Sequence, residues 1–187
     1  MRAYYYDNKP GNPTLPHEGE SIDSAVLTTM GVLFYHIPID SEGKWEAHVQ
    51  RIATHRDYKH SDVVETSREL LGETYEDAME KVWREHLHED EEIRYPLAGC
   101  GYFDVRELPT DRWIRIRADA GDLMVLPAGI YHRFALDSDE YIKTMRLFKE
   151  EPKWIAHYRS AETDQNPNRI KYLNDFNHAE RVQLVAI

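Results

Sequence analysis

Four residues in two short stretches have the types and spacing of a metal site. His86 and His88 are separated by one residue, so on a strand their imidazoles point to the same face. The charged run 89–91 predicts a turn, which brings the carboxylate of Glu92 back toward the two rings. A fourth ligand is expected from His132, which follows a Pro-Ala-Gly turn between two predicted strands. The pattern predicts a site of three nitrogens and one oxygen.

This set of ligands favours a catalytic metal ion. Three imidazoles and one carboxylate leave about two positions open on an octahedral ion, and the mixed nitrogen and oxygen set suits iron, nickel, cobalt or manganese. Adjacent open positions let a bidentate, oxygen-rich small molecule displace water, with the metal as Lewis acid and template. Structural zinc prefers a closed tetrahedral shell. We therefore expect catalysis on a small chelating substrate.

Two arginines and two aromatic residues are candidates for the wall of the site. Arg94 lies two residues after the glutamate and faces the same cavity if the strand continues, and Arg146 could point inward from a strand at 141–148. A guanidinium beside a bound enolate would stabilise the anion. Phe134 and Trp154 could form an apolar wall. A surface arginine and a core aromatic are the ordinary alternatives, and they stay open at this point.

Short strands separated by turns dominate the second half of the chain. Six strands are expected, at 93–97, 101–105, 113–117, 122–126, 131–136 and 141–148. Six short strands at close spacing predict a sandwich or a barrel. The two strands beside the Pro-Ala-Gly turn are expected to form a hairpin.

Helical patterns are concentrated in the first half. Expected elements are a strand at 3–6, a helix capped by Ser21 or Asp23 and ending near Met30, a strand at 32–37, and helices at 44–56 and 75–85. Thr74 and Asp77 form a capping-box signal for the last helix, whose apolar stripe is expected in the core with one or two members at the pocket. We predict a single domain over 1–187, mainly β, in which residues 1–85 form an α-rich N-terminal cover and residues 86–187 the β-barrel half.

The charge and composition of the chain exclude some classes of binding partner. A net charge of -11 disfavours nucleic acid and anionic membranes, since both would be repelled, and a small-molecule partner is favoured. No apolar run approaches the roughly 20 residues of a membrane span, and the N-terminal residues do not resemble a secretory signal. A single cysteine, Cys100, cannot form an intrachain disulfide, which is typical of a reducing compartment.

The two ligand stretches resemble the paired motifs of the cupin superfamily. The motif positions are matched by His86, His88, Glu92 and Gly99 in the first stretch and by Gly121, Pro127, Gly129 and His132 in the second. Glu80 and Leu136 replace the motif's leading glycine and final asparagine, and neither position is a metal ligand. The resemblance implies a cupin-type β-barrel, also described as a double-stranded β-helix or jelly roll.

Longer runs resemble the acireductone dioxygenase family of the eukaryotic type. These runs are 86–95, 101–106, 113–116, 126–134 and 145–148, together with 7–13 and 31–35 in the first half. The resemblance implies that one Fe²⁺ or Ni²⁺ ion per chain is held by His86, His88, Glu92 and His132. It implies that the substrate pocket is formed by Arg94, Arg146, Phe134 and Trp154, with the two arginines in the catalytic role of stabilising the anion.

The resemblance also implies a reaction of methionine salvage. The acireductone 1,2-dihydroxy-3-keto-5-(methylthio)pentene would be cleaved with O₂. Iron would give 4-methylthio-2-oxobutanoate and formate, and nickel would give 3-methylthiopropanoate, formate and carbon monoxide. We expect a monomer in the cytoplasm, and in the nucleus as for some family members, without nucleic-acid or membrane partners.

Three alternatives to this activity stay open on the sequence. The same ligands could serve a different cupin oxygenase or a metal-dependent isomerase. They could hold a structural metal in a binding or storage module. A metal-free β-sandwich is the third alternative.

Overall fold

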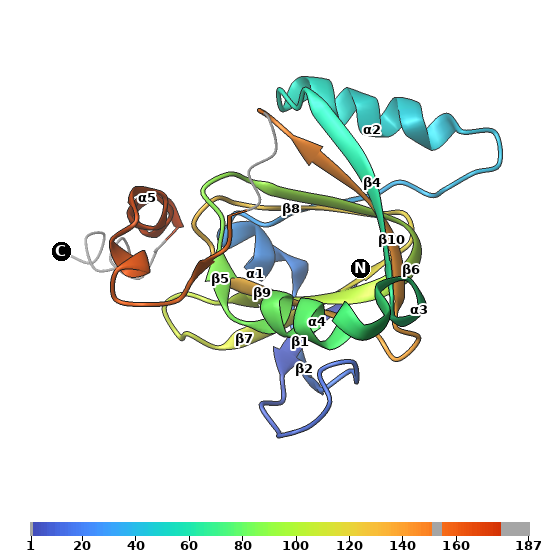
Figure 1. The fold of residues 1–187 in the computed structure, drawn as a ribbon. Coiled ribbons are helices and arrows are strands. Elements are labelled where there is room, and N and C mark those ends of the chain that lie inside the picture. The colour runs from blue at the N-terminus through green and yellow to red at the C-terminus, as the bar shows by residue number, and fades with distance from the viewer. Residues whose placement is uncertain (1, 151–154, 177–187) are drawn as a thin grey trace.

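Two antiparallel sheets that share one long strand form the centre of the fold. The computed structural model describes residues 2–150 and 155–176. The strands are β1 (Arg2–Tyr6), β2 (Glu18–Ser21), β3 (Leu33–His36), β4 (His60–Ser67), β5 (His86–Leu87), β6 (Glu92–Arg106), β7 (Trp113–Asp119), β8 (Asp122–Leu126), β9 (His132–Leu136), β10 (Tyr141–Phe148) and β11 (His157–Tyr158). One sheet has the order β11-β5-β9-β6-β7-β1-β2, and the other has the order β4-β10-β6-β8-β3. The strands surround a common interior (Figure 1).

Strand β6 passes from one sheet to the other at Gly99. Residues 92–99 pair with β8 and β10, whereas residues 100–106 pair with β7 and β9. Gly99 has a φ of 72°, and a Cβ there would lie 2.2 Å from the carbonyl oxygen of Tyr141, so only glycine fits. The expectation of two separate strands is therefore wrong, because glycine bends the chain without ending the ladder.

The turn before β9 does not form the expected hairpin. Strand β8 pairs with β3 and β6, whereas β9 pairs with β5 and β6. The Pro-Ala-Gly turn thus carries the chain from one sheet to the other. This crossing places His132 beside the short strand β5.

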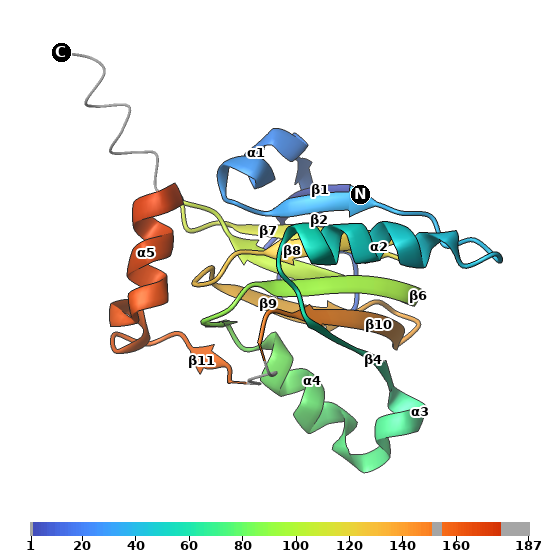
Figure 2. The same ribbon diagram turned by 90° about the horizontal axis from the view of Figure 1, so that it is seen from above.

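Five helices lie outside the sheets of the described chain. They are α1 (Ser24–Thr29), α2 (Lys44–His55), α3 (Arg68–Leu71), α4 (Tyr75–Trp83) and α5 (Pro167–Phe176). Figure 2 shows α1 on one side of the strands, α3 and α4 on the opposite side, and α5 at one end, and Figure 1 shows α2 above the strands. None of these helices has the length and apolar character needed to cross a bilayer.

Local capping explains where the helices begin. Asp23 accepts a hydrogen bond from the backbone N–H of Ala25 at 2.8 Å and starts α1, as expected. The capping box expected at Thr74 is absent. A 3₁₀ turn at Gly72–Thr74 leads directly into α4, and the Thr74 hydroxyl donates to the carbonyl of Leu71 at 2.8 Å.

The first 85 residues are not an α-rich cover, because the chain begins with a strand. Strand β1 pairs with β7, β3 with β8, and β4 with β10, so this half extends both sheets. Strand β4 was not predicted, since its polar residues resemble a loop. Alternation along β4 places Val64 and Thr66 on one face, which is the signal that period-two counting could have found.

Apolar residues of the strands fill the core on either side of the shared strand. The larger cluster is formed by Leu27, Met30, Val32, Phe103, Val105, Ile114, Ile116, Ala118, Met124, Leu126, Ile130 and Tyr172. A second cluster lies between α2 and the other sheet, around Tyr95, Leu123 and Val125. Because the strands are packed on these clusters, the side chains that they present are held in fixed positions.

Candidate metal centre and its pocket

Three histidines that are distant in sequence meet at the junction of β5, β6 and β9. His86 on β5 is the cross-strand partner of His132 on β9, and His88 follows directly after β5. The ring centroids are 4.5 Å apart for His86 and His132, 5.1 Å for His86 and His88, and 5.3 Å for His88 and His132. One nitrogen from each ring lies within 4.8 Å of the other two. This spacing fits three imidazoles around one metal ion.

Backbone carbonyl groups fix the orientation of all three rings. The Nδ1 atoms of His86, His88 and His132 lie 2.7, 2.7 and 3.0 Å from the carbonyl oxygens of Arg84, Ile155 and Ile130. Because a carbonyl oxygen only accepts, each Nδ1 must carry the proton. Each Nε2 therefore has a lone pair, which is the arrangement that orients histidine ligands in metal sites.

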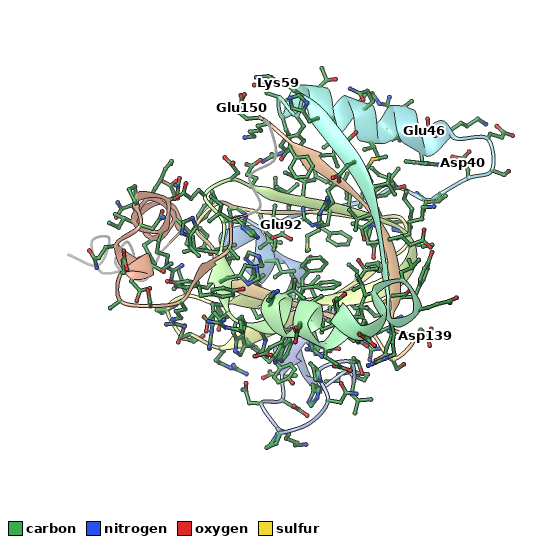
Figure 3. The ribbon with its side chains drawn as sticks, viewed as in Figure 1. Asp40, Glu46, Lys59, Glu92, Asp139 and Glu150 are labelled. Atoms are coloured by element: carbon green, nitrogen blue, oxygen red, sulfur yellow. The ribbon has the colours of Figure 1, made fainter. Side chains whose placement is uncertain are left out.

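Glu92 supplies an oxygen at the same point. Its Oε2 lies 2.8 Å from Nε2 of His132 and 3.4 Å from Nε2 of His88. The Oε2 of Glu92 and the Nε2 of His132 are buried and have no hydrogen-bond partner in the described chain, since both are acceptors. A cation between them would satisfy both atoms. Figure 3 shows Glu92 inside the ring of strands, whereas Asp40, Glu46 and Asp139 lie outside it.

The electrostatics of the site favour the protonation state that a metal ion requires. Burial lowers the pKa of His86 to about 3 and also lowers the pKa of His88. Burial alone would raise the pKa of Glu92, but the nearby guanidinium charge of Arg94 holds it well below its usual range. At neutral pH the two rings are neutral and the carboxylate is ionised, as binding to a metal demands.

These residues form one end of a cavity of about 380 Å³. Its other walls come from β4, α4, β6, β9, β10 and the segment at β11. The lining residues are Val64, Thr66, Lys81, Val82, His86, His88, Glu92, Arg94, Phe103, His132, Phe134, Ile142, Thr144, Arg146, Ala156 and Tyr158. The volume suits a small molecule, and the wall combines apolar side chains with a few charged groups.

Arg94 lies in the cavity beside the candidate ligands, as the period of two along β6 predicted. Its Nη2 is 2.9 Å from Oε1 of Glu92, and its Nη1 donates to the carbonyl of Ile93 at 3.0 Å. Burial lowers the pKa of Arg94, and the Glu92 carboxylate opposes this shift. The site thus presents a guanidinium in the cavity beside the candidate ligands.

Arg146 also lines the cavity, but its guanidinium is bound by a carboxylate that sequence reasoning did not find. Its Nε lies 2.7 Å from Oδ1 of Asp62, and its Nη2 contacts Oδ2. Arg94, Arg146 and Asp62 are cross-strand neighbours on β6, β10 and β4. This bidentate pair fixes Arg146 on the wall and offsets part of its charge.

The two aromatic candidates have different outcomes. Phe134 lies in the cavity wall, with its ring centroid 4.8 Å from that of Phe103. Gly101 makes room for it, since a Cβ there would lie 2.5 Å from Cε2 of Phe134. Trp154 lies outside the described residues, so its predicted place in the pocket stays a prediction.

Several lining residues escaped the sequence analysis because their strands were missed or their role is purely spatial. Val64 and Thr66 belong to β4, which was not predicted. Tyr158 reaches the cavity because β11 pairs with β5. No local pattern indicates a pairing between two strands of two residues each. Thr144 could have been found, since it lies two residues before Arg146 on the same face.

The geometry defines a class of protein: a β-barrel with a candidate centre for one metal ion inside a small-molecule cavity. Comparison with known sequences is more specific. A sequence model of the ARD/ARD' family matches residues 2–156. "Acireductone dioxygenase 2" of Coprinopsis cinerea is 49% identical over 173 residues, covering 92% of this chain and 85% of that protein. "Acireductone dioxygenase" of Neurospora crassa is 48% identical over 184 residues, covering 98% of this chain and 99% of that protein.

A solved structure supports the same fold. The acireductone dioxygenase from Bacillus anthracis with a cadmium ion in its active center superposes with a TM-score of 0.66 at 19% identity, covering 84% of this chain and 97% of that one. The chain belongs to the ARD/ARD' family, the acireductone dioxygenases.

Proposed function

We propose that this protein is a metal-dependent acireductone dioxygenase. Its substrate would be 1,2-dihydroxy-3-keto-5-(methylthio)pentene, cleaved with O₂ in methionine salvage. The observation that carries the proposal is the convergence of three oriented histidines and one buried carboxylate at the end of a cavity of about 380 Å³. Family membership and the names of the relatives support the choice of substrate.

His86, His88, Glu92 and His132 would hold one divalent ion, iron or nickel. The nitrogen and oxygen donors suit either metal, so supply decides which is loaded. When bound, the ion would act as a Lewis acid and template for the chelating substrate and its reaction with O₂. We propose that the iron form gives 4-methylthio-2-oxobutanoate and formate, and that the nickel form gives 3-methylthiopropanoate, formate and carbon monoxide.

The side chains around the ligands bind and orient the substrate. Arg94, held by Glu92 at 2.9 Å, lies where it can stabilise the negative charge of an enediolate. Arg146 contributes a second guanidinium, fixed by Asp62. Phe134 and the apolar residues of β4 and β10 would contact the methylthio tail and exclude water from that end of the cavity.

The function is tested by metal reconstitution. The protein is stripped of metal with a chelator, loaded with Fe²⁺ or Ni²⁺, and given the acireductone with and without O₂. We expect one metal ion per chain by elemental analysis, consumption of O₂, and the two product sets by mass spectrometry. Turnover without O₂ would indicate an isomerase, and tight metal binding without turnover would indicate a storage module. Absence of stoichiometric metal would overturn the proposal.

We also propose that the chain forms a single domain, that one chain is sufficient for catalysis, and that the enzyme is a monomer. The four candidate ligands and both cavity arginines come from a single chain, which supports this proposal. Light scattering coupled to gel filtration tests this point. We further propose a cytoplasmic enzyme that is also present in the nucleus, which a fluorescent fusion of the full chain would test.

A further inference from the structure

Residues 155–176 form a segment that contacts the chain on both sides of the paired histidines. Strand β11 in this segment pairs with β5, so that His157 faces Leu87 and Tyr158 faces His86. The carbonyl oxygen of Ile155 accepts the hydrogen bond from Nδ1 of His88. In Figure 2, β11 and α5 lie along one end of the strands. Most of this segment lies beyond residues 2–156, which the family model matches.

Polar contacts anchor the segment to the residues that flank the histidine pair. Nη1 of Arg159 lies 2.8 Å from Oε1 of Glu85, one residue before His86. Nδ2 of Asn166 donates to Oε1 of Glu89, one residue after His88, at 3.0 Å. Both ends of the His-x-His stretch are therefore tied to the same segment.

Arg169 extends these contacts to the turn that precedes the third histidine. Its Nη1 lies 3.2 Å from the carbonyl oxygen of Gly129, and the N–H of Gly129 donates to the carbonyl of His88 at 2.9 Å. A Cβ on Gly129 would lie 2.3 Å from the carbonyl oxygen of Asn168, so the helix and the turn are in close contact. Gly129, which lies three residues before His132, thus contacts Arg169 through its carbonyl group and the backbone of His88 through its N–H group.

Burial of the charged Arg169 side chain costs free energy that its contacts only partly offset. The residue is 5% exposed, and its Nε has no hydrogen-bond partner in the described chain. Among the described residues no carboxylate lies within ion-pair distance, and the guanidinium carbon is 4.4 Å from the ring of Tyr131 and 5.5 Å from that of Tyr172. A methionine or leucine would fill the same space at lower cost. The contact that neither would make is the hydrogen bond to Gly129.

We propose that Arg169 is a positioning residue of the metal centre. Through the backbone of Gly129 it fixes the relative position of the His-x-His stretch and the turn before His132, and so sets the affinity and geometry of metal binding. This inference rests on the proposed function in one respect, that the four candidate ligands bind a metal. It gives helix α5 a role in the metal centre, although α5 lies far from the candidate ligands in the sequence.

The test compares three variants of the full chain by their binding of Co²⁺. Arg169→Met keeps the packing and removes the hydrogen bond, and Arg169→Lys keeps a donor and the charge. Tyr172→Phe is the matched control, since it removes the hydrogen bond from α5 to the carbonyl of Met30 (3.2 Å) and leaves the turn untouched. The Co²⁺ dissociation constant is measured by chelator competition, and the ligand geometry by the visible absorption spectrum. Thermal unfolding of the metal-free proteins is recorded in parallel.

We expect Arg169→Met to weaken Co²⁺ binding about tenfold, at the lower end of what lost supporting hydrogen bonds cost in metal sites. Its spectrum should change, Arg169→Lys should recover part of the affinity, and Tyr172→Phe should lower the unfolding temperature without altering affinity or spectrum. If Arg169→Met does not fold, Arg169→Gln replaces it, because the shorter polar side chain also loses the donor at the Gly129 carbonyl.

The outcomes separate this inference from the proposed function. Equal Co²⁺ affinity and spectrum in wild type and Arg169→Met would overturn the positioning role and leave the enzyme assignment intact. An equal loss in Tyr172→Phe would also overturn it, since general docking of α5 would then explain the effect. A wild-type protein that binds no Co²⁺ at His86, His88 and His132 would contradict the proposed function itself.

Discussion

Nε2 of His132 and Oε2 of Glu92 lie 2.8 Å apart, buried and without a hydrogen-bond partner in the described chain. The proton of the histidine is on Nδ1, which donates to the carbonyl of Ile130 at 3.0 Å. Two lone pairs therefore face each other, an arrangement that costs free energy until a cation lies between them. The fold keeps this unfavourable contact because β6 and β9 are fixed by their ladders and by the core.

Replacing His132 by alanine is expected to abolish tight metal binding and turnover. The variant loses one of three nitrogens, and the remaining ligands cannot close around the ion in the same geometry. Metal content is measured by elemental analysis after dialysis, and activity by O₂ consumption. His48→Ala, at an exposed position on α2, is the control and should match the wild type. Retention of both metal and turnover in His132→Ala would remove this residue from the centre.

Replacing Arg94 by alanine should leave the metal bound and lower kcat/KM by about 10²- to 10³-fold, as removal of one electrostatic contact to a developing anion does. The guanidinium lies against Glu92 on the cavity side and is the charge best placed to meet the substrate. Arg94→Lys should recover part of the rate, since it keeps the charge and loses the planar fork. Arg51→Ala, exposed on α2, serves as the control. An unchanged kcat/KM with normal metal content would exclude a role for Arg94 in the reaction.

The candidate ligands could be predicted from the sequence because their spacing is local. The His-x-His pair, the glutamate four residues after His88 and the Pro-x-Gly turn before His132 are all short-range patterns, and period-two alternation extended the prediction to Arg94. Most strands of the second half were found for the same reason, as with 122–126 and 141–148, whose bounds match β8 and β10.

Long-range pairing explains what the sequence did not predict. The polar strand β4 carries only its short alternation as a local signal, and Asp62 is identified as the partner of Arg146 only from the pairing of β4 with β10. The turn before β9 changes sheets rather than forming a hairpin, which depends on where β6 bends. The contact between Arg169 and Gly129 joins residues 40 apart in the chain, and no local pattern predicts it.

Replacing Gly101 by alanine should weaken substrate binding and leave metal binding unchanged. The added Cβ would meet the Phe134 ring at 2.5 Å and push it toward the cavity, because the backbone of β6 is held by two neighbouring strands. We expect KM to rise several-fold with an unchanged metal dissociation constant. In a Phe134→Leu background the same substitution should have little further effect, since the clash is gone. Equal effects of Gly101→Ala in both backgrounds would show that it acts elsewhere.

Acid should destabilise the metal-free protein through His86. In the folded chain burial lowers the pKa of His86 to about 3, whereas in the unfolded chain a histidine takes up its proton below about pH 6.5. The unfolded state therefore binds the extra proton in this window, and stability present above about pH 6.5 is lost as the pH falls toward 3. Urea unfolding of the metal-free protein at pH values from about 7.5 to about 4.5, which cover the upper part of this window, measures the slope of the free energy of unfolding against pH. In His86→Gln the slope below pH 6.5 should be shallower by about 1.4 kcal/mol per pH unit, one proton's share. Identical slopes in the two proteins would mean that His86 is already protonated in the folded chain, which would contradict the hydrogen-bonded neutral ring described for the metal centre.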